Sequence, residues 1–288
     1  MSRLPIHPYR GRLAPSPTGL LHLGHAATFW VAAERARLAQ GSLILRNDDL
    51  DPARSRPEYV RAMIADLQWL GSKWQEGPDI GGPCAPYNQS ERLPLHRAAL
   101  ETLRAGNFVY PCTCSRRDVQ AAATAPHAAD DEPVYPGTCR AKSSSRDSPP
   151  GGCCFRFRVP DGEWISFVDG NLGEQRFRAG RDFGDFVVWR NDGVPAYQLA
   201  CVADDHAMGI TEVVRGADLL VSTARQLLLY RALDWVAPCF FHCTLLRDEE
   251  GRRLAKRHGA MTLKALRERA VDPAELRGQS GAGRLTPA

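Results

Sequence analysis

Apolar and polar positions follow two rhythms along the chain, and these predict where helices and strands form. An apolar run bounded by turn residues predicts a strand at 42–46, and helical spacing predicts helices at 54–70, 92–104 and 223–235. Strand and helix alternate in the first and last parts of the chain, which is typical of a parallel sheet with a ligand at the carboxyl ends of its strands. We therefore expect an α/β fold with a Rossmann-like parallel sheet.

The middle of the chain departs from this pattern. Cysteine pairs are followed by a low-complexity segment at 141–152, which cannot bury a core. Short alternating runs typical of antiparallel strands follow at 155–159, 164–168 and 186–189. We expect an α+β insert that splits the Rossmann-like domain. The expected boundaries are 1–108 and 195–265 for the two halves, 109–194 for the insert, and 266–288 for a short helix and tail.

The composition sets broad limits on the class of protein. Of the 288 residues, 43% are hydrophobic and 24% are charged, and the net charge of +4 permits a nucleic-acid partner without requiring one. The first residues contain no continuous apolar segment, and no apolar run is long enough to cross a membrane, so we expect a cytoplasmic protein without membrane contact. The nine cysteines are an odd number, which argues against a disulfide framework and favours reduced thiols.

Residues 12–25 read RLAPSPTGLLHLGH and hold the most informative motif. Two prolines and a Thr-Gly pair predict a turn between a strand and a helix, and His22, Gly24 and His25 stand where the helix begins. A helix start presents unpaired N–H groups and the positive end of the helix dipole, and Gly24 lets a ligand approach the backbone. The two imidazoles, three positions apart, can donate to phosphate oxygens, so the segment suits an anionic ligand such as ATP.

This string resembles the HIGH signature of class I aminoacyl-tRNA synthetases, and in particular that of their glutamyl branch. The tetrad stands here as HLGH at residues 22–25. The resemblance implies a catalytic Rossmann-like domain in which His22 and His25 stabilise the ATP phosphates while the α-phosphoryl group is attacked. Gly24 would belong to the same ATP-binding segment.

A basic string at residues 251–260, GRRLAKRHGA, is the second motif of this resemblance. Taken alone, a solvated basic loop explains it. It is similar to the KLSKRHGA form of the KMSKS loop, which implies that Lys256 neutralises the β- and γ-phosphates of Mg²⁺-bound ATP as pyrophosphate leaves. Arg253 and Ala255 depart from the usual Lys and Ser. The expected ATP-binding residues of the loop are Arg253, Leu254, Lys256 and Arg257.

Selective binding of glutamate needs cationic or hydroxyl-bearing groups for two carboxylates and a carboxylate for one ammonium group. By resemblance to the glutamyl branch, Arg12 and Arg215 would each bind a carboxylate, and Asp48 the α-ammonium group. Asp48 departs from the family's usual glutamate by one methylene. For Arg215 the alternative is a structural salt bridge to Asp204, Asp205 or Asp218. The positions that match the family's glutamate site are Arg12, Ala14, Ser16, Asp48, Tyr197 and Arg215.

Cysteine spacing in the insert predicts a metal site. Cys112, Cys114 and Cys139 supply three of the four ligands that tetrahedral zinc needs, although isolated small apolar side chains are the alternative. Standalone glutamyl-synthetase-like proteins carry Cys-x-Cys and then Tyr-x-x-x-Cys, which implies Tyr135 as the fourth ligand of one structural Zn²⁺. A metal can force the unusual loss of the tyrosine proton. The rival fourth ligands are His127, Cys153 and Cys154, and the thiols expected to be structural are Cys84, Cys201, Cys239 and Cys243, the last two flanking His242.

The chain resembles the short, zinc-bearing branch of this group. The residues after the basic string are too few for the helical anticodon-binding domain of a full glutamyl-tRNA synthetase. Resemblance to the glutamyl-queuosine tRNA(Asp) synthetase family implies tRNA-independent activation of L-glutamate by ATP and transfer to queuosine at the wobble position of tRNA(Asp). We expect a monomer. A solvated loop explains most basic residues of the insert, and the alternative is that they contact RNA phosphates; these residues are Arg116, Arg117, Arg140, Lys142 and Arg146.

Two other functions stay open from the sequence. The chain could be a shortened glutamyl-tRNA synthetase that charges tRNA(Glu), or a paralogue that binds amino acid or RNA without catalysis. The complete HLGH tetrad and the retained Lys256 argue against the paralogue.

Overall fold

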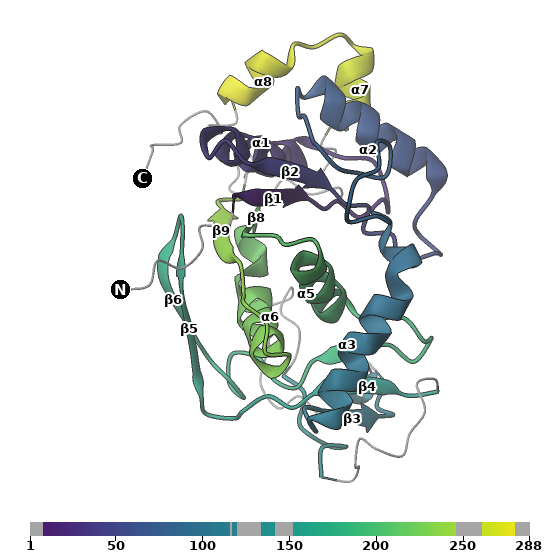
Figure 1. Ribbon diagram of the computed structural model, residues 1–288, viewed down its shortest axis with the longest axis vertical. Coiled ribbons are helices and arrows are strands. Elements are labelled where there is room, and N and C mark those ends of the chain that lie inside the picture. Colours follow the sequence, from purple (N-terminus) through teal and green to yellow (C-terminus); the bar gives the residue numbers. More distant parts are fainter. Residues whose placement is uncertain (1–7, 116, 120–133, 142–151, 246–260, 280–288) are drawn as a thin grey trace. The chain divides into compact units, whose positions relative to one another are not determined.

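The computed structural model describes residues 8–115, 117–119, 134–141, 152–245 and 261–279 (Figure 1). The chain divides into two compact units. Unit 1 combines Met1–Glu91, Met208–Leu219 and Pro238–Ala288, and unit 2 combines Arg92–Ala207 and Leu220–Ala237. The predicted insert, residues 109–194, falls within unit 2.

Unit 1 is built on parallel strands, as the alternation of strand and helix predicts. β1 (Arg10–Leu13) pairs in parallel with β2 (Ser42–Leu45), and β8 (Glu212–Gly216) pairs in parallel with β9 (Cys239–Cys243). The Thr211 N–H donates to the Arg10 carbonyl oxygen at 2.9 Å, which sets β8 beside β1. The strands are mostly buried, as expected for parallel strands covered on both faces. The helices of this unit are α1 (Leu23–Leu38), α2 (Pro57–Trp69), α7 (Leu263–Glu268) and α8 (Pro273–Gln279).

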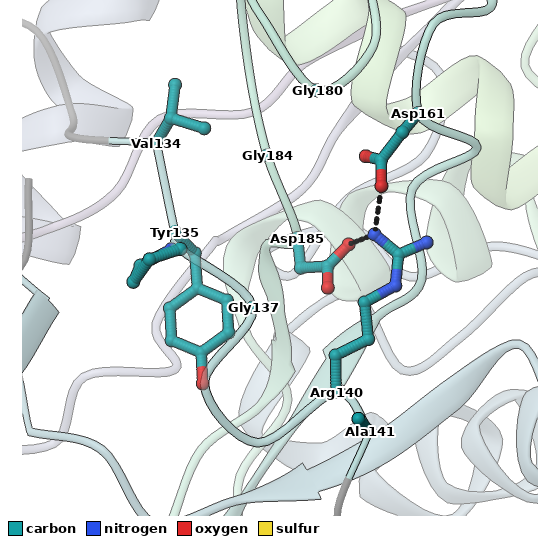
Figure 2. A pocket seen from close by; sticks show the side chains of 10 residues that line it. Val134, Tyr135, Gly137, Arg140, Ala141, Asp161, Gly180, Gly184 and Asp185 are labelled. Atoms are coloured by element: carbon teal, nitrogen blue, oxygen red, sulfur yellow. Dashed lines mark hydrogen bonds and ion pairs between the residues drawn. The ribbon is translucent and has the colours of Figure 1, made fainter.

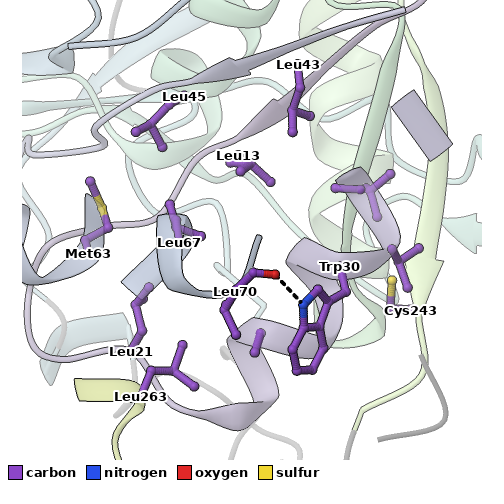
Figure 3. Close-up of a cluster of buried hydrophobic side chains, with 14 of the residues drawn as sticks. Leu13, Leu21, Trp30, Leu43, Leu45, Met63, Leu67, Leu70, Cys243 and Leu263 are labelled. Atoms are coloured by element: carbon purple, nitrogen blue, oxygen red, sulfur yellow. Dashed lines mark hydrogen bonds between the residues drawn. The ribbon is translucent and has the colours of Figure 1, made fainter. Parts of the chain in front are cut away.

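A cluster of buried apolar side chains joins α1 and α2 to these strands (Figure 3). Leu13 from β1, Leu45 from β2 and Leu67 from α2 are fully buried in it. Trp30 of α1 donates its indole N–H to the Leu70 carbonyl oxygen at 3.1 Å. Burial of one such side chain stabilises the fold by roughly 1.5–3 kcal/mol. The cluster therefore fixes the strand ends from which the candidate site is built.

Two helix boundaries differ from the prediction for identifiable reasons. α2 begins at Pro57 rather than residue 54, because a proline without an N–H suits the first turn of a helix. Asp51 and Arg54 instead form an ion pair of 2.6 Å in the preceding turn. α6 (Leu220–Ala232) ends before the predicted residue 235, because Asp234 has a φ of 56°, which a right-handed helix cannot include.

Unit 2 combines antiparallel strands with helices, as predicted for the middle of the chain. β3 (Val109–Cys112), β4 (Cys154–Phe157) and β7 (Val187–Trp189) form one antiparallel sheet with β4 at its centre. β5 (Trp164–Asp169) pairs with β6 (Gly173–Arg178), a strand that the hydrophobic pattern did not predict. The helices of this unit include α3 (Leu93–Ala105), α5 (Tyr197–Ala207) and α6. Short 3₁₀ turns at Gln89–Arg92 and Ala217–Leu219 stand where the chain passes from unit 1 to unit 2.

None of the helices in the described part of the chain has both the length and the apolar character that crossing a membrane requires.

Candidate active site and metal centre

The turn after β1 lies against the segment that follows β2. The pairing of the two strands continues past their ends: the Arg46 N–H donates to the Leu13 carbonyl oxygen at 2.8 Å, and the Asp48 N–H donates to that of Pro15 at 3.2 Å. These bonds bring Asp48 together with the turn at 14–16, which holds two of the predicted glutamate-binding residues. The place is the carboxyl end of two parallel strands, where ligands bind in such sheets.

His22 and His25 form the start of α1. His22 is the N-cap residue: its Nδ1 accepts from the Gly24 N–H at 3.1 Å, and its backbone N–H donates to Nδ1 of His25 at 3.2 Å. The ring centroids lie 3.8 Å apart. Because both Nδ1 atoms accept hydrogen bonds, each neutral ring carries its proton on Nε2. The capping geometry therefore makes Nε2 of both rings a donor, as an anionic ligand requires.

Arg12 and Arg215, the predicted carboxylate-binding residues, are both buried in unit 1. Arg12 on β1 is 6% exposed, and its Nη1 donates to the Val214 carbonyl oxygen at 3.1 Å. Arg215, the next residue along β8, is 4% exposed, and its Nε lies 3.2 Å from Nε2 of His242. Two buried cations on neighbouring strands suit a ligand with two carboxylates.

Asp48 is held by a residue that the sequence analysis missed. Arg46 is fully buried, and its Nε and Nη2 donate to the two carboxylate oxygens of Asp48 at 2.7 and 3.3 Å. A bidentate pair of this kind fixes the direction of the carboxylate. The spacing carried part of the signal, because side chains two positions apart on an extended chain point to the same side.

Three thiols and a phenol converge in unit 2. The sulfur atoms of Cys112, Cys114 and Cys139 all lie within 4.8 Å of one another. The Tyr135 hydroxyl oxygen lies 3.3 Å from the Cys112 sulfur and 3.4 Å from the Cys114 sulfur, and the sulfurs of Cys114 and Cys139 lie 3.6 Å apart. The structure thus brings together all four residues predicted to bind the metal.

These separations fit a tetrahedral metal ion. Zinc bonds of about 2.3 Å to sulfur and about 2.0 Å to oxygen place two sulfurs about 3.8 Å apart, and a sulfur and an oxygen about 3.5 Å apart. The distances from the Tyr135 oxygen to the sulfurs of Cys112 and Cys114, and from the Cys114 sulfur to that of Cys139, agree with these values to within a few tenths of an ångström. The rival ligand Cys154 instead donates its S–H to the Cys112 carbonyl oxygen at 3.1 Å. The three thiols could therefore hold a metal ion, and the Tyr135 hydroxyl lies beside them.

Neighbouring groups also bias the protonation of the cluster. Hydrogen bonds with Cys154, Tyr135 and Arg156 hold the pKa of the Cys112 thiol well below its usual range. Burial, together with hydrogen bonds to the thiols, raises the pKa of Tyr135. Arg156, which was not predicted, donates to the Cys112 sulfur at 3.3 Å and stacks 4.0 Å above the Tyr135 ring. A metal bound by this cluster would have to displace the phenol proton.

A pocket of about 640 Å³ opens beside Tyr135 (Figure 2). Arg140 lies in it, with Nη1 2.7 Å from an Asp161 carboxylate oxygen and 3.4 Å from one of Asp185. Asp185 also accepts from the Tyr110 hydroxyl at 2.6 Å and the Val159 N–H at 2.8 Å. Arg140 was predicted as a possible contact for RNA phosphates, but the structure places it in this ion-pair network.

Some predicted residues lie outside the described part of the chain. They are Arg116, His127, Lys142, Arg146 and the loop residues Arg253, Leu254, Lys256 and Arg257. The chain is described again from Met261, where Thr262 forms an antiparallel bridge with His22 and the Leu263 N–H donates to the Leu21 carbonyl oxygen at 2.8 Å. The segment after the basic string is therefore attached to the histidine turn. Tyr197 begins α5 of unit 2.

The remaining thiols are spread over both units. Cys201 is buried, as are Cys243 and His242 of β9, in agreement with the structural role predicted for them. Cys84 is half-buried, and Arg10 donates to its sulfur at 3.6 Å. Cys239 is exposed, so the prediction that it belongs to the core is wrong. It begins β9, and the buried part of that strand starts one residue later.

Unit 1 contains parallel strands, two histidines at a helix start and buried arginines on the strands. This arrangement is the one expected for the catalytic domain of a class I aminoacyl-tRNA synthetase. Residues 9–277 match the family model for the catalytic domain of class I tRNA synthetases (E and Q). The chain belongs to this family. It is therefore an enzyme of the ligase class, whose substrates are ATP, an amino acid and a tRNA.

Similarity to individual proteins extends over most of the chain. It is 52% identical over 268 residues to glutamyl-Q tRNA(Asp) synthetase of Symbiobacterium thermophilum, covering 91% of this chain and 82% of that protein. It is 49% identical over 273 residues to the protein of the same name from Nitratidesulfovibrio vulgaris, covering 93% and 84%. A crystal structure of glutamate-tRNA synthetase from Elizabethkingia anophelis matches with a TM-score of 0.83 and 30% identity, covering 98% of this chain and 63% of that one.

Proposed function

We propose that the chain activates L-glutamate with ATP in the absence of tRNA and transfers the glutamate to queuosine at the wobble position of tRNA(Asp). The observation that carries the proposal is the identity of 49% and 52% to two relatives named glutamyl-Q tRNA(Asp) synthetase, of which the chain covers more than four fifths. The buried charges of unit 1 support glutamate as the amino acid, because two arginines and an aspartate complement its three ionised groups.

In the first half-reaction, an oxygen of the α-carboxylate of glutamate attacks the α-phosphorus of ATP. The bond between the α-phosphorus and the pyrophosphate group breaks, and glutamyl adenylate forms. Arg12 and Arg215 each bind one carboxylate of glutamate, and Asp48, directed by Arg46, binds its ammonium group. The Nε2–H groups of His22 and His25, with the N-terminus of α1, stabilise the charge that develops on the phosphates. Lys256 neutralises the departing pyrophosphate, and the Mg²⁺ that accompanies ATP would supply further positive charge there.

In the second half-reaction, a hydroxyl of the queuosine cyclopentene ring attacks the carbonyl carbon of glutamyl adenylate. The mixed anhydride bond breaks, AMP leaves, and the hydroxyl loses its proton. Because the adenylate is already an activated acyl group, the reaction needs no nucleophile from the enzyme. The chain acts as a monomer in this scheme.

Zinc has a structural role in this proposal. One Zn²⁺ bound by Cys112, Cys114, Tyr135 and Cys139 would tie the segment 134–141 to the end of β3, and the distances among the four ligand atoms support this assignment. When bound, the ion supplies a rigid cross-link between two segments.

Glutamate-dependent exchange between ATP and pyrophosphate, with and without added tRNA, tests the proposed activation step. We expect exchange without tRNA, and none when aspartate replaces glutamate. Exchange that requires tRNA(Glu) would contradict the proposal and favour a shortened glutamyl-tRNA synthetase. No exchange under any condition would favour a paralogue that only binds its ligands.

A further inference from the structure

The outward face of the β5–β6 hairpin has no role in the chemistry described above. Along β5 the buried side chains of Ile165 and Asp169 alternate with exposed Trp164, Ser166 and Val168. In the antiparallel register Trp164 lies opposite Arg178, and Ser166 lies opposite Arg176. Both arginines are exposed. The outward face therefore carries an indole and two guanidinium groups at one end. We name Trp164, Arg176 and Arg178 together the Trp-Arg face.

The hairpin holds this face in a defined geometry. The Asp169 carboxylate accepts from the N–H groups of Asn171 and Leu172 at 3.0 and 2.9 Å, and Gly173 follows with a φ of 71°. On the inward face the rings of Phe167 and Phe177 stack with their centroids 6.3 Å apart. The turn and the inward stack fix the register, so the outward side chains keep their positions relative to one another.

Trp164 is the centre of the Trp-Arg face. Its side chain is 49% exposed, although it is large and apolar. The Arg176 guanidinium carbon lies 4.9 Å from the centre of the Trp164 ring, a cation–π distance. An exposed indole covered by a guanidinium offers two planar groups on which a nucleic-acid base can stack.

The nearby acidic groups leave this end of the hairpin positive. Glu163 is paired with Arg231, and the Asp169 carboxylate is buried in the turn. Asp182 accepts from the Arg178 N–H at 2.6 Å and lies 4.0 Å from the Arg181 guanidinium, so its charge is also opposed by an arginine. Glu174 is the exposed acid of the outward face, and it lies opposite Val168 at the other end of the register. A phosphate beside Trp164 would therefore meet two arginines, whereas a phosphate beside Val168 would meet a carboxylate.

We propose that the Trp-Arg face, Trp164 with Arg176 and Arg178, binds an unpaired nucleotide of the tRNA substrate. The base stacks on the Trp164 indole and the Arg176 guanidinium, and Arg178 contacts the adjoining phosphate. This inference rests on the proposed function, which supplies a tRNA with an unpaired anticodon loop as substrate. An apolar protein partner fits less well, because two of the three groups on this face are cations, and protein interfaces are depleted of charge at their centres.

Equilibrium binding of queuosine-containing tRNA(Asp) to the full chain, measured at several salt concentrations, tests the inference. We expect Trp164→Ala to weaken binding about tenfold, within the range for loss of one base–aromatic stack, and Trp164→Phe to restore most of the affinity. Arg178→Ala removes the phosphate contact and should lower the slope of log Kd against log salt by about 0.7, whereas Arg176→Ala removes a stacking group and should weaken binding with a smaller change of slope. Glu174→Gln should tighten binding slightly, because it removes a repulsive carboxylate. Arg97→Ala is the matched control, since Arg97 is an exposed arginine on α3 of the same unit.

Glutamate-dependent exchange without tRNA separates this inference from the proposed function. Wild-type protein without exchange would contradict the proposed function, while the comparison of RNA affinities would still decide the role of the Trp-Arg face. Wild-type affinity and salt slope in Trp164→Ala and in the Arg176→Ala/Arg178→Ala double variant would overturn the inference. The inference would also be overturned if these variants bound the tRNA as tightly as wild type but no longer bound a protein that wild type binds. Equal weakening by Trp164→Phe and Trp164→Ala would contradict a stacking role.

Discussion

The histidine turn of unit 1 and the thiol cluster of unit 2 both join residues that are distant in sequence, but they are held together differently. In unit 1, backbone hydrogen bonds and the buried Arg46–Asp48 pair set the positions of the functional groups. In unit 2, the candidate ligand atoms lie next to one another, and the Tyr135 hydroxyl is hydrogen-bonded to the thiols of Cys112 and Cys114. Changes in unit 1 should therefore lower activity with little loss of stability, and changes in the thiol cluster should do the reverse.

The largest effect is expected for Arg215→Ala. Removing one buried partner of a charge pair costs about 2–5 kcal/mol, so kcat/KM for glutamate in the exchange reaction should fall by about 30-fold to 5,000-fold. Arg61→Ala, an exposed arginine on α2, is the control and should behave like wild type. If kcat/KM for glutamate fell less than about threefold in Arg215→Ala, Arg215 would not bind glutamate, and the expected contrast between the two units would be wrong.

A pair of substitutions at His22 separates capping from catalysis. Asparagine is a good N-cap residue and can accept from the Gly24 N–H, but it lacks the Nε2–H donor. We expect both His22→Asn and His22→Ala to lower kcat by about 100-fold. His22→Ala alone should also lose about 1 kcal/mol of stability against denaturant. Wild-type kcat in His22→Asn would mean that the histidine only caps the helix.

The thiol cluster should show the opposite behaviour. Cys139→Ser is expected to abolish binding of the proposed zinc ion and to lower Tm by roughly 5–10 °C, as for a loss of about 3 kcal/mol. Metal analysis of the purified protein and thermal melts measure both effects. Cys153→Ser is the matched control, because Cys153 is also partly buried but lies outside the cluster. Full zinc content in Cys139→Ser, or zinc loss in Cys153→Ser, would contradict the ligand assignment.

The smallest effect is expected for His206. It tests whether the stability of unit 2 depends on pH through a group other than its thiols. His206 stacks on Trp235 with the centroids 4.0 Å apart, and burial lowers the pKa of His206 from its ordinary value of 6.5. The folded state then binds fewer protons than the unfolded state, so stability is present above pH 6.5 and is lost as the pH falls below it. Thermal melts at pH 7.5 and 5.5 should differ less in His206→Phe than in wild type. An unchanged difference would exclude this source.

The chemistry of unit 1 was the easier part to predict from the sequence, because it stands in contiguous strings. His22, Gly24 and His25 were expected at a helix start, and that is where they lie. Arg46 was missed, since its link to Asp48 depends on the close approach of the strand ends as well as on sequence spacing. The clustering of the three thiols was predicted from their spacing, but the contribution of Arg156 depends on the pairing of β3 with β4, which no local pattern encodes.

β6 marks the limit of the hydrophobic pattern. The sequence GEQRFR has one apolar side chain, Phe177, and gives no alternating signal of its own. Its strand geometry comes from pairing with β5 over six residues and from the Asp169 turn. Long-range pairing of this kind overrides local propensity, so the Trp-Arg face could be recognised only after the fold was known.

Locating the glutamate on the RNA is the most direct test of the proposed function. The wild-type chain would be incubated with ATP, labelled glutamate and queuosine-containing tRNA(Asp), and with the same tRNA after removal of its 3′-terminal CCA. We expect equal labelling of both RNAs, recovery of the label in the anticodon fragment after nuclease digestion, and no labelling of tRNA(Asp) that lacks queuosine. Labelling that requires the CCA end would contradict the account and assign the chain to ordinary charging of tRNA.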